Sequence, residues 1–113
     1  MQRTMIIIAM LALLGGHAVQ AAAETCEYDT EWGILTIYYD WNTETASGYY
    51  PYQNGQIEGY WSGQETLEGQ WWQNDSNGYF VFYFNASGFT GSWMYANDSN
   101  WQGNWDGNLR GCY

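Results

Sequence analysis

The chain has 113 residues, of which 46% are hydrophobic, 20% aromatic and only 12% charged. Twelve acidic residues outnumber two basic ones, and the formal net charge is −10. A chain this acidic is expected to be repelled by nucleic acid and by anionic membrane surfaces, so we expect neither as a partner. The length suits one small domain.

The N-terminal segment has the three-part pattern of a secretory signal peptide. Residues 1–5 carry one cation, Arg3, an apolar run follows over 6–14, and small residues end at Ala23. The A-x-A cleavage rule predicts removal of residues 1–23 and a single domain over 24–113. The apolar run is too short to span a bilayer as a stable helix. We therefore expect a secreted product, extracellular or periplasmic.

Removal of this segment would leave few residues suited to catalysis. It would take His17, the only histidine, and leave Arg110 as the only cation. Ser-His-Asp and Cys-His catalysis, histidine metal sites and Schiff-base lysines are thereby excluded. Glu58 and Glu68, at equivalent places in a repeat, are the two carboxylates that a glycosidase would need. We expect them on the outer face, where they keep the protein soluble, and we expect no enzyme activity, cofactor or metal.

Two cysteines, Cys26 and Cys112, lie near the ends of the predicted mature chain. In an oxidising compartment an isolated pair most simply forms one disulfide, the alternative being two free thiols. On the chain-entropy model, closing so long a loop stabilises a fold by roughly 4–5 kcal/mol. That increment matters for a small domain with a modest core.

A five-residue pattern recurs: an apolar residue, any residue, glycine, any residue and an aromatic residue. Strict copies occupy residues 57–61, 67–71, 89–93 and 101–105, and looser copies occupy 46–50 and 109–113. Period two is the periodicity of a β-strand, so each copy places its apolar, glycine and aromatic residues on one face. Because glycine in mid-strand costs stability, we expect it to serve sheet coiling and to leave room for indole rings. Clearing space for a ligand is the alternative.

Two further strands bring the predicted count to eight. One covers residues 32–39, ahead of the repeats, and the other covers 79–84, inside the one long gap between repeat glycines. Turn signals separate the predicted strands: Asn54-Gly55, Ser62-Gly63, Asn77-Gly78, Ser87-Gly88 and Asp106-Gly107. The segment 75–78 is better explained as a hairpin turn than as a calcium loop, because it lacks the distal glutamate.

Eight strands with short connections predict an all-β, antiparallel up-and-down meander. We expect it to close into a small barrel, which pairs the first strand with the last. The cysteines favour closure, since Cys26 just precedes the predicted first strand and Cys112 lies in the last. An open coiled sheet or a sandwich is the alternative.

The glycine-x-aromatic strands and small size resemble avidin-type and lipocalin-like barrels. That resemblance implies a small ligand in the barrel mouth, although no biotin contact aligns residue by residue. Nearly the whole mature chain is similar to small secreted bacterial proteins of no assigned function. They share an opening like residues 28–35, YDTEWGIL, and a close like residues 89–93 and 101–107, FTGSW and WQGNWDG. This second resemblance implies no activity.

Eight tryptophans and eleven tyrosines exceed what a core of this size can enclose. Exposed rings beside amides and carboxylates are typical of sugar binding, because rings stack on sugar faces while the polar groups bind hydroxyls. The repeat tryptophans are expected in the core: Trp61, Trp71, Trp93 and Trp105. The predicted ligand-binding residues lie outside the strict repeat face: Trp41, Tyr49, Tyr50, Tyr52, Tyr60 and Trp72. A core plus a self-association surface explains the surplus equally well.

The strand over 79–84 is apolar on both faces, with Tyr79, Val81 and Tyr83 on one and three phenylalanines on the other. A half-solvated antiparallel strand would alternate, so something must cover this strand or it pairs with another chain. We favour a homo-oligomer interface through residues 79–84.

The negative charge allows a further alternative, capture of a basic protein. The segments 47–50 and 61–63 resemble the motif of periplasmic lysozyme inhibitors, apart from a missing basic residue before the last glycine. Altogether the sequence predicts a secreted, non-catalytic binding protein for a carbohydrate or another small ligand. An acidic interaction protein and a self-assembling structural protein are the alternatives.

Overall fold

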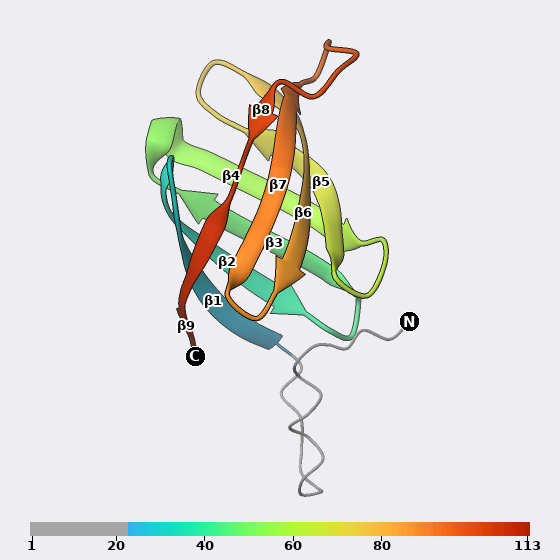
Figure 1. Cartoon of the computed structure of the whole chain (residues 1–113). Coiled ribbons are helices and arrows are strands. Elements are labelled where there is room, and N and C mark those ends of the chain that lie inside the picture. The colour runs from blue at the N-terminus through green and yellow to red at the C-terminus, as the bar shows by residue number, and fades with distance from the viewer. Residues whose placement is uncertain (1–22) are drawn as a thin grey trace, which may run out of the picture.

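The structure, a computed structural model, describes residues 23–113 and is a closed eight-stranded antiparallel β-barrel (Figure 1). The predicted signal peptide lies outside the described residues except for Ala23, with which the first strand begins. The strands are β1 Ala23–Thr30, β2 Gly33–Asp40, β3 Thr45–Tyr50, β4 Gly55–Trp61, β5 Thr66–Trp72, β6 Asn77–Asn85, β7 Gly88–Tyr95, β8 Gly103–Asn104 and β9 Gly107–Cys112. A 3₁₀ turn, Tyr52–Asn54, connects β3 to β4.

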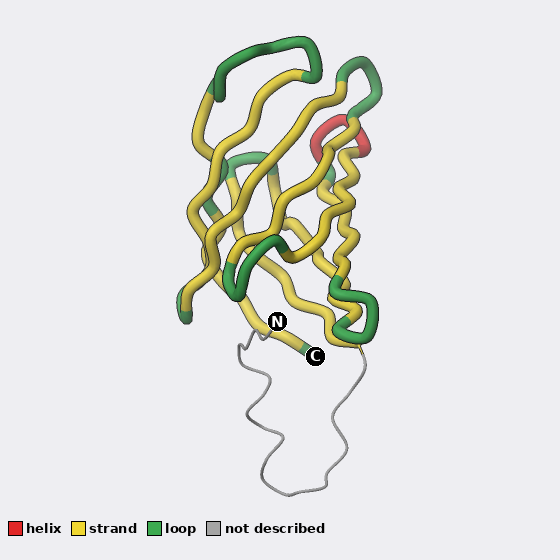
Figure 2. Tube along the Cα trace, turned by 90° about the vertical axis from the view of Figure 1, so that its right-hand side faces the viewer, coloured by secondary structure: helices red, strands yellow, loops and turns green. Residues whose placement is uncertain are grey.

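Each strand from β1 to β6 pairs antiparallel with the next one along the chain. β7 pairs with both β8 and β9, and β9 pairs with β1, which closes the ring. The meander prediction and its closure are therefore confirmed. Figures 1 and 2 show the connections gathered at the two ends of the barrel. Among residues 23–113 there is no helix long and apolar enough to cross a membrane.

The inward face of the barrel is the predicted repeat face. Phe82 lies at its centre, with the Phe89 ring centroid 4.0 Å away and the Trp105 centroid 5.1 Å away. The predicted core position of the repeat tryptophans is confirmed for Trp61, Trp71 and Trp105, while Trp93 is half-buried against the same core. Other inward residues come from every part of the sheet: Tyr28, Leu35, Ile37, Tyr39, Ala46, Tyr50, Ile57, Leu67 and Phe80.

The predicted number of barrel strands is right, but the prediction missed the first strand. β1 contains Cys26, which was expected to precede the sheet. Its inward residues Cys26 and Tyr28 alternate with outward Glu27 and Asp29, a period-two pattern too short to recognise among the charges. The expected start of a strand at Trp32 is also wrong, because Trp32 lies in the turn between β1 and β2.

The last barrel strand was counted twice in the prediction. Residues 101–105 and 109–113 were expected as two strands, yet β8 and β9 both run antiparallel to β7 as parts of one interrupted strand. The Trp105 amide donates to the Gly91 carbonyl (2.9 Å), and the Gly91 amide donates to the Asp106 carboxylate (3.3 Å). A side chain thus takes the place of a ladder carbonyl, so Asp106-Gly107 is a break within a strand and not a hairpin turn.

The turn predicted at Asn77-Gly78 was placed too late in the chain. Both residues belong to β6, and the turn covers 73–76, closed by a hydrogen bond from the Gln73 amide to the Ser76 carbonyl (2.8 Å). Gly78 is needed for packing instead, since a Cβ there would lie 2.7 Å from the Trp71 ring.

The expected role of the repeat glycines is confirmed at two positions. A Cβ on Gly69 would lie 1.9 Å from the Glu58 carbonyl oxygen, where β4 and β5 approach with Gly59 and Gly69 directly opposite one another. A Cβ on Gly103 would lie 2.9 Å from Nε1 of Trp93. The first glycine allows the sheet to coil and the second leaves room for an indole.

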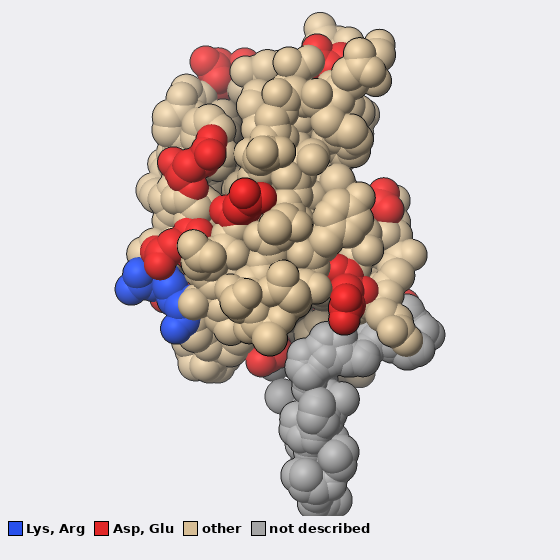
Figure 3. All heavy atoms as spheres, viewed as in Figure 1, with Lys and Arg blue, Asp and Glu red and all other residues tan. Residues whose placement is uncertain are grey.

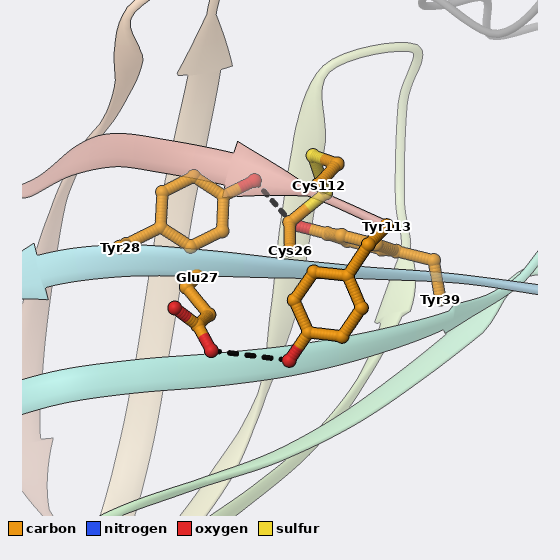
Figure 4. The surroundings of a disulfide bond; sticks show 6 residues. All are labelled: Cys26, Glu27, Tyr28, Tyr39, Cys112 and Tyr113. Atoms are coloured by element: carbon orange, nitrogen blue, oxygen red, sulfur yellow. Dashed lines mark hydrogen bonds between the residues drawn. A yellow bond between two sulfur atoms is a disulfide. The ribbon is translucent and has the colours of Figure 1, made fainter.

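The predicted disulfide joins Cys26 and Cys112, which lie directly opposite in the β1–β9 ladder (Figure 4). Beyond it, Thr25 and Tyr113 exchange two backbone hydrogen bonds, and the Tyr113 hydroxyl donates to Glu27 (3.1 Å). Arg110, at a bulge in this ladder, donates to the carboxylate of Asp29 (3.1 Å). The seam that closes the barrel is therefore fastened covalently, and the disulfide is consistent with an oxidising compartment.

Candidate functional site

The turns of the closed meander lie alternately at the two ends of the barrel, so each end carries its own set of turn residues. The upper end carries the turns β1–β2, β3–β4, β5–β6 and β7–β8, and the lower end carries the other turns together with Cys112. In Figure 1 the β7–β8 turn stands at the top and the C-terminus at the bottom. Because alternate turns of a meander share an end, side chains far apart in sequence meet there.

A cavity of about 240 Å³ opens at the upper end, and we call it the upper mouth. Six aromatic and four polar residues line it: Trp32, Tyr52, Trp71, Trp93, Tyr95 and Trp105, with Gln53, Gln73, Asp75 and Ser76. The volume is below the roughly 300–1,000 Å³ typical of sites for drug-sized ligands, so the upper mouth suits a single ring.

The rings of the upper mouth contact one another, three pairs edge to face and one tilted. Trp93 is central, with its ring centroid 5.2 Å from Tyr95, 6.1 Å from Trp71 and 6.5 Å from Trp32. The Trp32 ring in turn lies 5.0 Å from that of Tyr52. Such contacts hold the rings in place, because each pair is stabilised by about 0.5–1.5 kcal/mol beyond its buried area.

Hydrogen bonds fix the polar side of the upper mouth. Gln73 donates from Nε2 to the Tyr50 hydroxyl (2.8 Å), and burial raises the pKa of Tyr50 to about 12. The Asn74 amide donates to the Gln53 carbonyl (3.0 Å), and Asn54 donates to the Asn74 side chain (3.1 Å). The turns β3–β4 and β5–β6 are thus tied to each other by hydrogen bonds.

Two buried polar atoms of this site have no hydrogen-bond partner within residues 23–113. They are Nε1 of Trp105, a donor, and Oε1 of Gln53, an acceptor. A buried donor or acceptor left unpaired costs about 1–3 kcal/mol. Gln53 also has a left-handed backbone, with φ of 52°, which a side chain of this kind rarely adopts.

The six predicted ligand-binding residues do not gather at one site. Tyr52 lines the upper mouth, but Tyr50 is only 1% exposed and lies beneath it, so the expectation of an exposed ring there is wrong. Trp41 is at the lower end. The other three lie on the outer face: Tyr49 against Tyr38, Tyr60 on β4, and the half-buried Trp72 on β5.

Three tryptophans of the upper mouth, Trp71, Trp93 and Trp105, were missed because they were assigned to the core. Trp71 and Trp105 are 3% and 2% exposed, so they belong to the core and at the same time form the floor of the cavity. The positions of these residues along their strands could have identified them from the sequence. Trp71, Trp93 and Tyr95 stand near the ends of strands that run toward the same end of a meander, the end to which the Trp32 and Tyr52 turns belong.

Glu58 and Glu68 lie on the outer face of the barrel, as expected, and both line a shallow groove of about 670 Å³ that we call the outer groove. Its other main walls are Tyr60, Tyr79 and Trp101. Glu58 pairs with Gln70 and Tyr60 pairs with Glu68, so the two carboxylates are diagonal neighbours on adjacent strands. The acidic side chains in Figure 3 are spread over the visible face and do not form one patch.

Comparison of the chain with protein-family models, curated proteins and solved structures finds no match in any of the three.

Proposed function

We propose that the protein is a secreted, non-catalytic binding protein that takes one sugar ring of a carbohydrate in the upper mouth. The observation that supports this most is the convergence of four tryptophans and two tyrosines with two amides, a carboxylate and a hydroxyl on one cavity. Rings bind the apolar faces of a sugar, and the polar groups bind its hydroxyls.

The unpaired atoms fit the chemistry of a hydroxyl, which both donates and accepts. A sugar hydroxyl could accept from Trp105 Nε1, and another could donate to Gln53 Oε1, after small adjustments of these buried side chains. Each new hydrogen bond would recover a desolvation cost that the free protein bears. The resemblance to avidin-type and lipocalin-like barrels, which bind ligands in the mouth, agrees with this proposal.

Secretion belongs to the same proposal. The predicted signal peptide would direct the chain out of the cytoplasm, and the Cys26–Cys112 disulfide is of the kind that persists in an oxidising compartment. An extracytoplasmic binding protein meets free glycans and cell-wall polysaccharides, for which a small aromatic mouth is suited. The resemblance to small secreted bacterial proteins points to the same location.

The proposal is tested by titrating the protein with di- and trisaccharides of glucose, N-acetylglucosamine, mannose and galactose while tryptophan fluorescence is followed. We expect saturable binding of one sugar class that hardly changes with added salt, since the contacts are stacking and neutral hydrogen bonds. Tyr95→Ala should weaken it at least tenfold, and Tyr83→Ala, on the outer face of β6, should leave it unchanged. An absence of binding across the panel, or an equal loss in both variants, would refute the proposal.

A second candidate function, capture of a basic protein, is favoured by the outer groove. Glu58 and Glu68 lie there between exposed aromatic rings, an arrangement that suits a lysine or arginine side chain. Binding of lysozyme, used as a basic probe, should then weaken strongly with salt and be lost on Glu58→Gln with Glu68→Gln. Binding that ignores salt would exclude this function.

Self-assembly through residues 79–84 stays a prediction, in a narrower form. β6 pairs with β5 and β7 along both of its edges, and Phe80 and Phe82 are fully inward. Association would therefore use the outward side chains of Tyr79 and Tyr83, since Val81 between them is only 7% exposed. A charge at Tyr83 would disrupt such an interface, whereas a charge at Phe82 would disrupt the core.

A further inference from the structure

Two exposed tyrosines on the outer face of the barrel lie beside one another on adjacent strands. Tyr49 of β3 pairs with Thr36 of β2, and Tyr38 follows Thr36 on the same side of β2, so the two tyrosines are diagonal neighbours. Their ring centroids are 6.1 Å apart and their planes are inclined by 31°. Diagonal neighbours on a sheet are within reach of one another when both side chains are aromatic. The β2–β3 ladder therefore brings the two rings into contact.

Exposure separates this pair from the other tyrosines. Tyr38 is 43% exposed and Tyr49 is 51% exposed, so neither ring belongs to the core and both are open to solvent. Among residues 23–113 they are the only two tyrosines whose rings contact one another. Tyr28 and Tyr39 share a hydrogen bond of 2.8 Å, but both are buried. An oxidant in solution can therefore reach both members of the Tyr38–Tyr49 pair.

Hydrogen bonds give the phenolic protons of this surface a place to go. A hydrogen bond with Tyr49 raises the pKa of Tyr38, and Tyr113 and Glu27 are close enough to act on the same hydroxyl electrostatically. Tyr113 donates to the Glu27 carboxylate (3.1 Å), which raises the pKa of Tyr113 (Figure 4). An electron leaves a phenol more easily when its proton can pass to a positioned acceptor in the same step.

We propose that Tyr38 and Tyr49 form a site of oxidative modification, at which a peroxidase and hydrogen peroxide join the two rings as a dityrosine. Each phenol gives up one electron and one proton, and hydrogen peroxide takes up both electrons and both protons and leaves as two molecules of water. The two phenoxyl radicals then form a carbon–carbon bond between Cε atoms, ortho to the oxygens. The hydrogen on each of these carbons moves to the oxygen of its own ring, so both hydroxyls are restored and the protein has lost two hydrogen atoms.

The position of the rings favours coupling within one molecule. Because they are already in contact, each radical meets the other at an effective concentration far above that of a second protein molecule. Exposed side chains change rotamer within nanoseconds, so the two Cε atoms can approach. The formal net charge of −10 also keeps two copies of the chain apart. The product would tie β2 to β3 as the disulfide ties β1 to β9.

This site is independent of the proposed sugar site and of the outer groove, because neither Tyr38 nor Tyr49 lines either of them. The experiment treats the purified protein with a haem peroxidase and hydrogen peroxide and follows dityrosine by fluorescence and mass spectrometry. The expected product is a monomer lacking two hydrogen atoms, with the peptides of Tyr38 and Tyr49 joined after digestion. The yield per molecule should not change on tenfold dilution. Coupling mainly between molecules, a yield that falls on dilution, or no dityrosine would overturn the proposal.

Variants locate the modification. Tyr38→Phe and Tyr49→Phe should each lower the yield of dityrosine at least tenfold, and each removes only an exposed hydroxyl. Tyr60→Phe is the matched control, since Tyr60 is 53% exposed on β4, away from the pair, and should leave the yield unchanged. Tyr113→Phe should also leave the joined peptides in place. Equal yields in the Tyr38 and Tyr60 variants, or a loss of the product in the Tyr113 variant alone, would contradict the assignment.

Unfolding gives a second readout. Tyr38 and Tyr49 lie in the two strands of one hairpin, so a bond between their rings closes a loop in the unfolded chain and lowers its entropy. The coupled protein should therefore unfold at a higher urea concentration than the untreated protein. Tyr49→Phe treated in the same way should show no such shift. A shift of equal size in this variant would assign the change to oxidation elsewhere and contradict the link between β2 and β3.

Discussion

Removal of the Cys26–Cys112 disulfide should cost this barrel a large part of its stability. The two cysteines are 86 residues apart in sequence, and they join the first strand to the last. For a loop of that length the chain-entropy relation gives a stabilisation of roughly 4–5 kcal/mol at 25 °C. A domain of about 90 residues has a total stability of only about 5–14 kcal/mol. The noncovalent contacts of the seam, between Thr25 and Tyr113 and around Arg110, remain after reduction.

The assay is urea unfolding of the oxidised protein, the reduced protein and a Cys26→Ala, Cys112→Ala variant. With a slope of about 1–2 kcal/mol per molar urea, the midpoint should fall by about 2–5 M on reduction. The variant should resemble the reduced protein, with a small further loss because the Cys26 side chain is buried. A loss below about 1 kcal/mol on reduction would refute the reasoning, because the unfolded chain would then gain little freedom from the open loop.

Two further predictions concern stability. Gly69→Ala should destabilise the barrel by about 1–3 kcal/mol, because its Cβ would lie 1.9 Å from the Glu58 carbonyl oxygen. The control variant Gly111→Ala has open space around the added Cβ, so its stability should stay within about 0.5 kcal/mol of the unchanged protein. Equal effects of the two substitutions in chemical unfolding would contradict the close approach of β4 and β5. The pKa values of Tyr28 and Tyr50 are raised by burial from 10 to about 12, so their contribution to stability is complete below pH 10, decreases above it and is lost once the pH passes 12. Unfolding measured against pH should show this decrease, and Tyr50→Phe should make it shallower; an unchanged slope would show that Tyr50 ionises as readily in the folded state as in the unfolded one.

The repeat was sufficient to predict the inside of the barrel. Because period two separates the faces of a strand, Ile57, Gly59 and Trp61 had to share a face, and that face is the core. The disulfide was predictable from the positions of two cysteines in a chain expected to be secreted. Neither inference needed long-range information. The core face followed from local alternation along each strand, and the disulfide followed from the presence of two cysteines.

The ends of the sheet could not be predicted in the same way. β1 is held by pairing with β2 on one side and β9 on the other, so its few apolar residues suffice once the ring is closed. The break before β9 depends on the Asp106 side chain reaching the Gly91 amide, a contact that sequence spacing does not reveal. Tertiary pairing decided both cases.

The candidate site was only partly predictable because the most exposed rings are not the rings that line the cavities. Rings outside the repeat face, such as Tyr49 and Tyr60, are exposed but lie apart on the outer surface. The ring-lined cavities use residues that are half-buried or buried, among them Trp93 and Trp105 at one end and Trp61 at the other. Which rings meet depends on the direction of each strand and on closure of the barrel.

The most direct test of sugar binding in the upper mouth is to follow the tryptophan indole N–H signals by NMR during a glycan titration. We predict that the signals of Trp93 and Trp105 move with the bound fraction, and that those of Trp72 and Trp101, on the outer surface, stay in place. Movement confined to Trp72 and Trp101, or to Trp41 and Trp61 at the lower end, would contradict the assignment of the carbohydrate site.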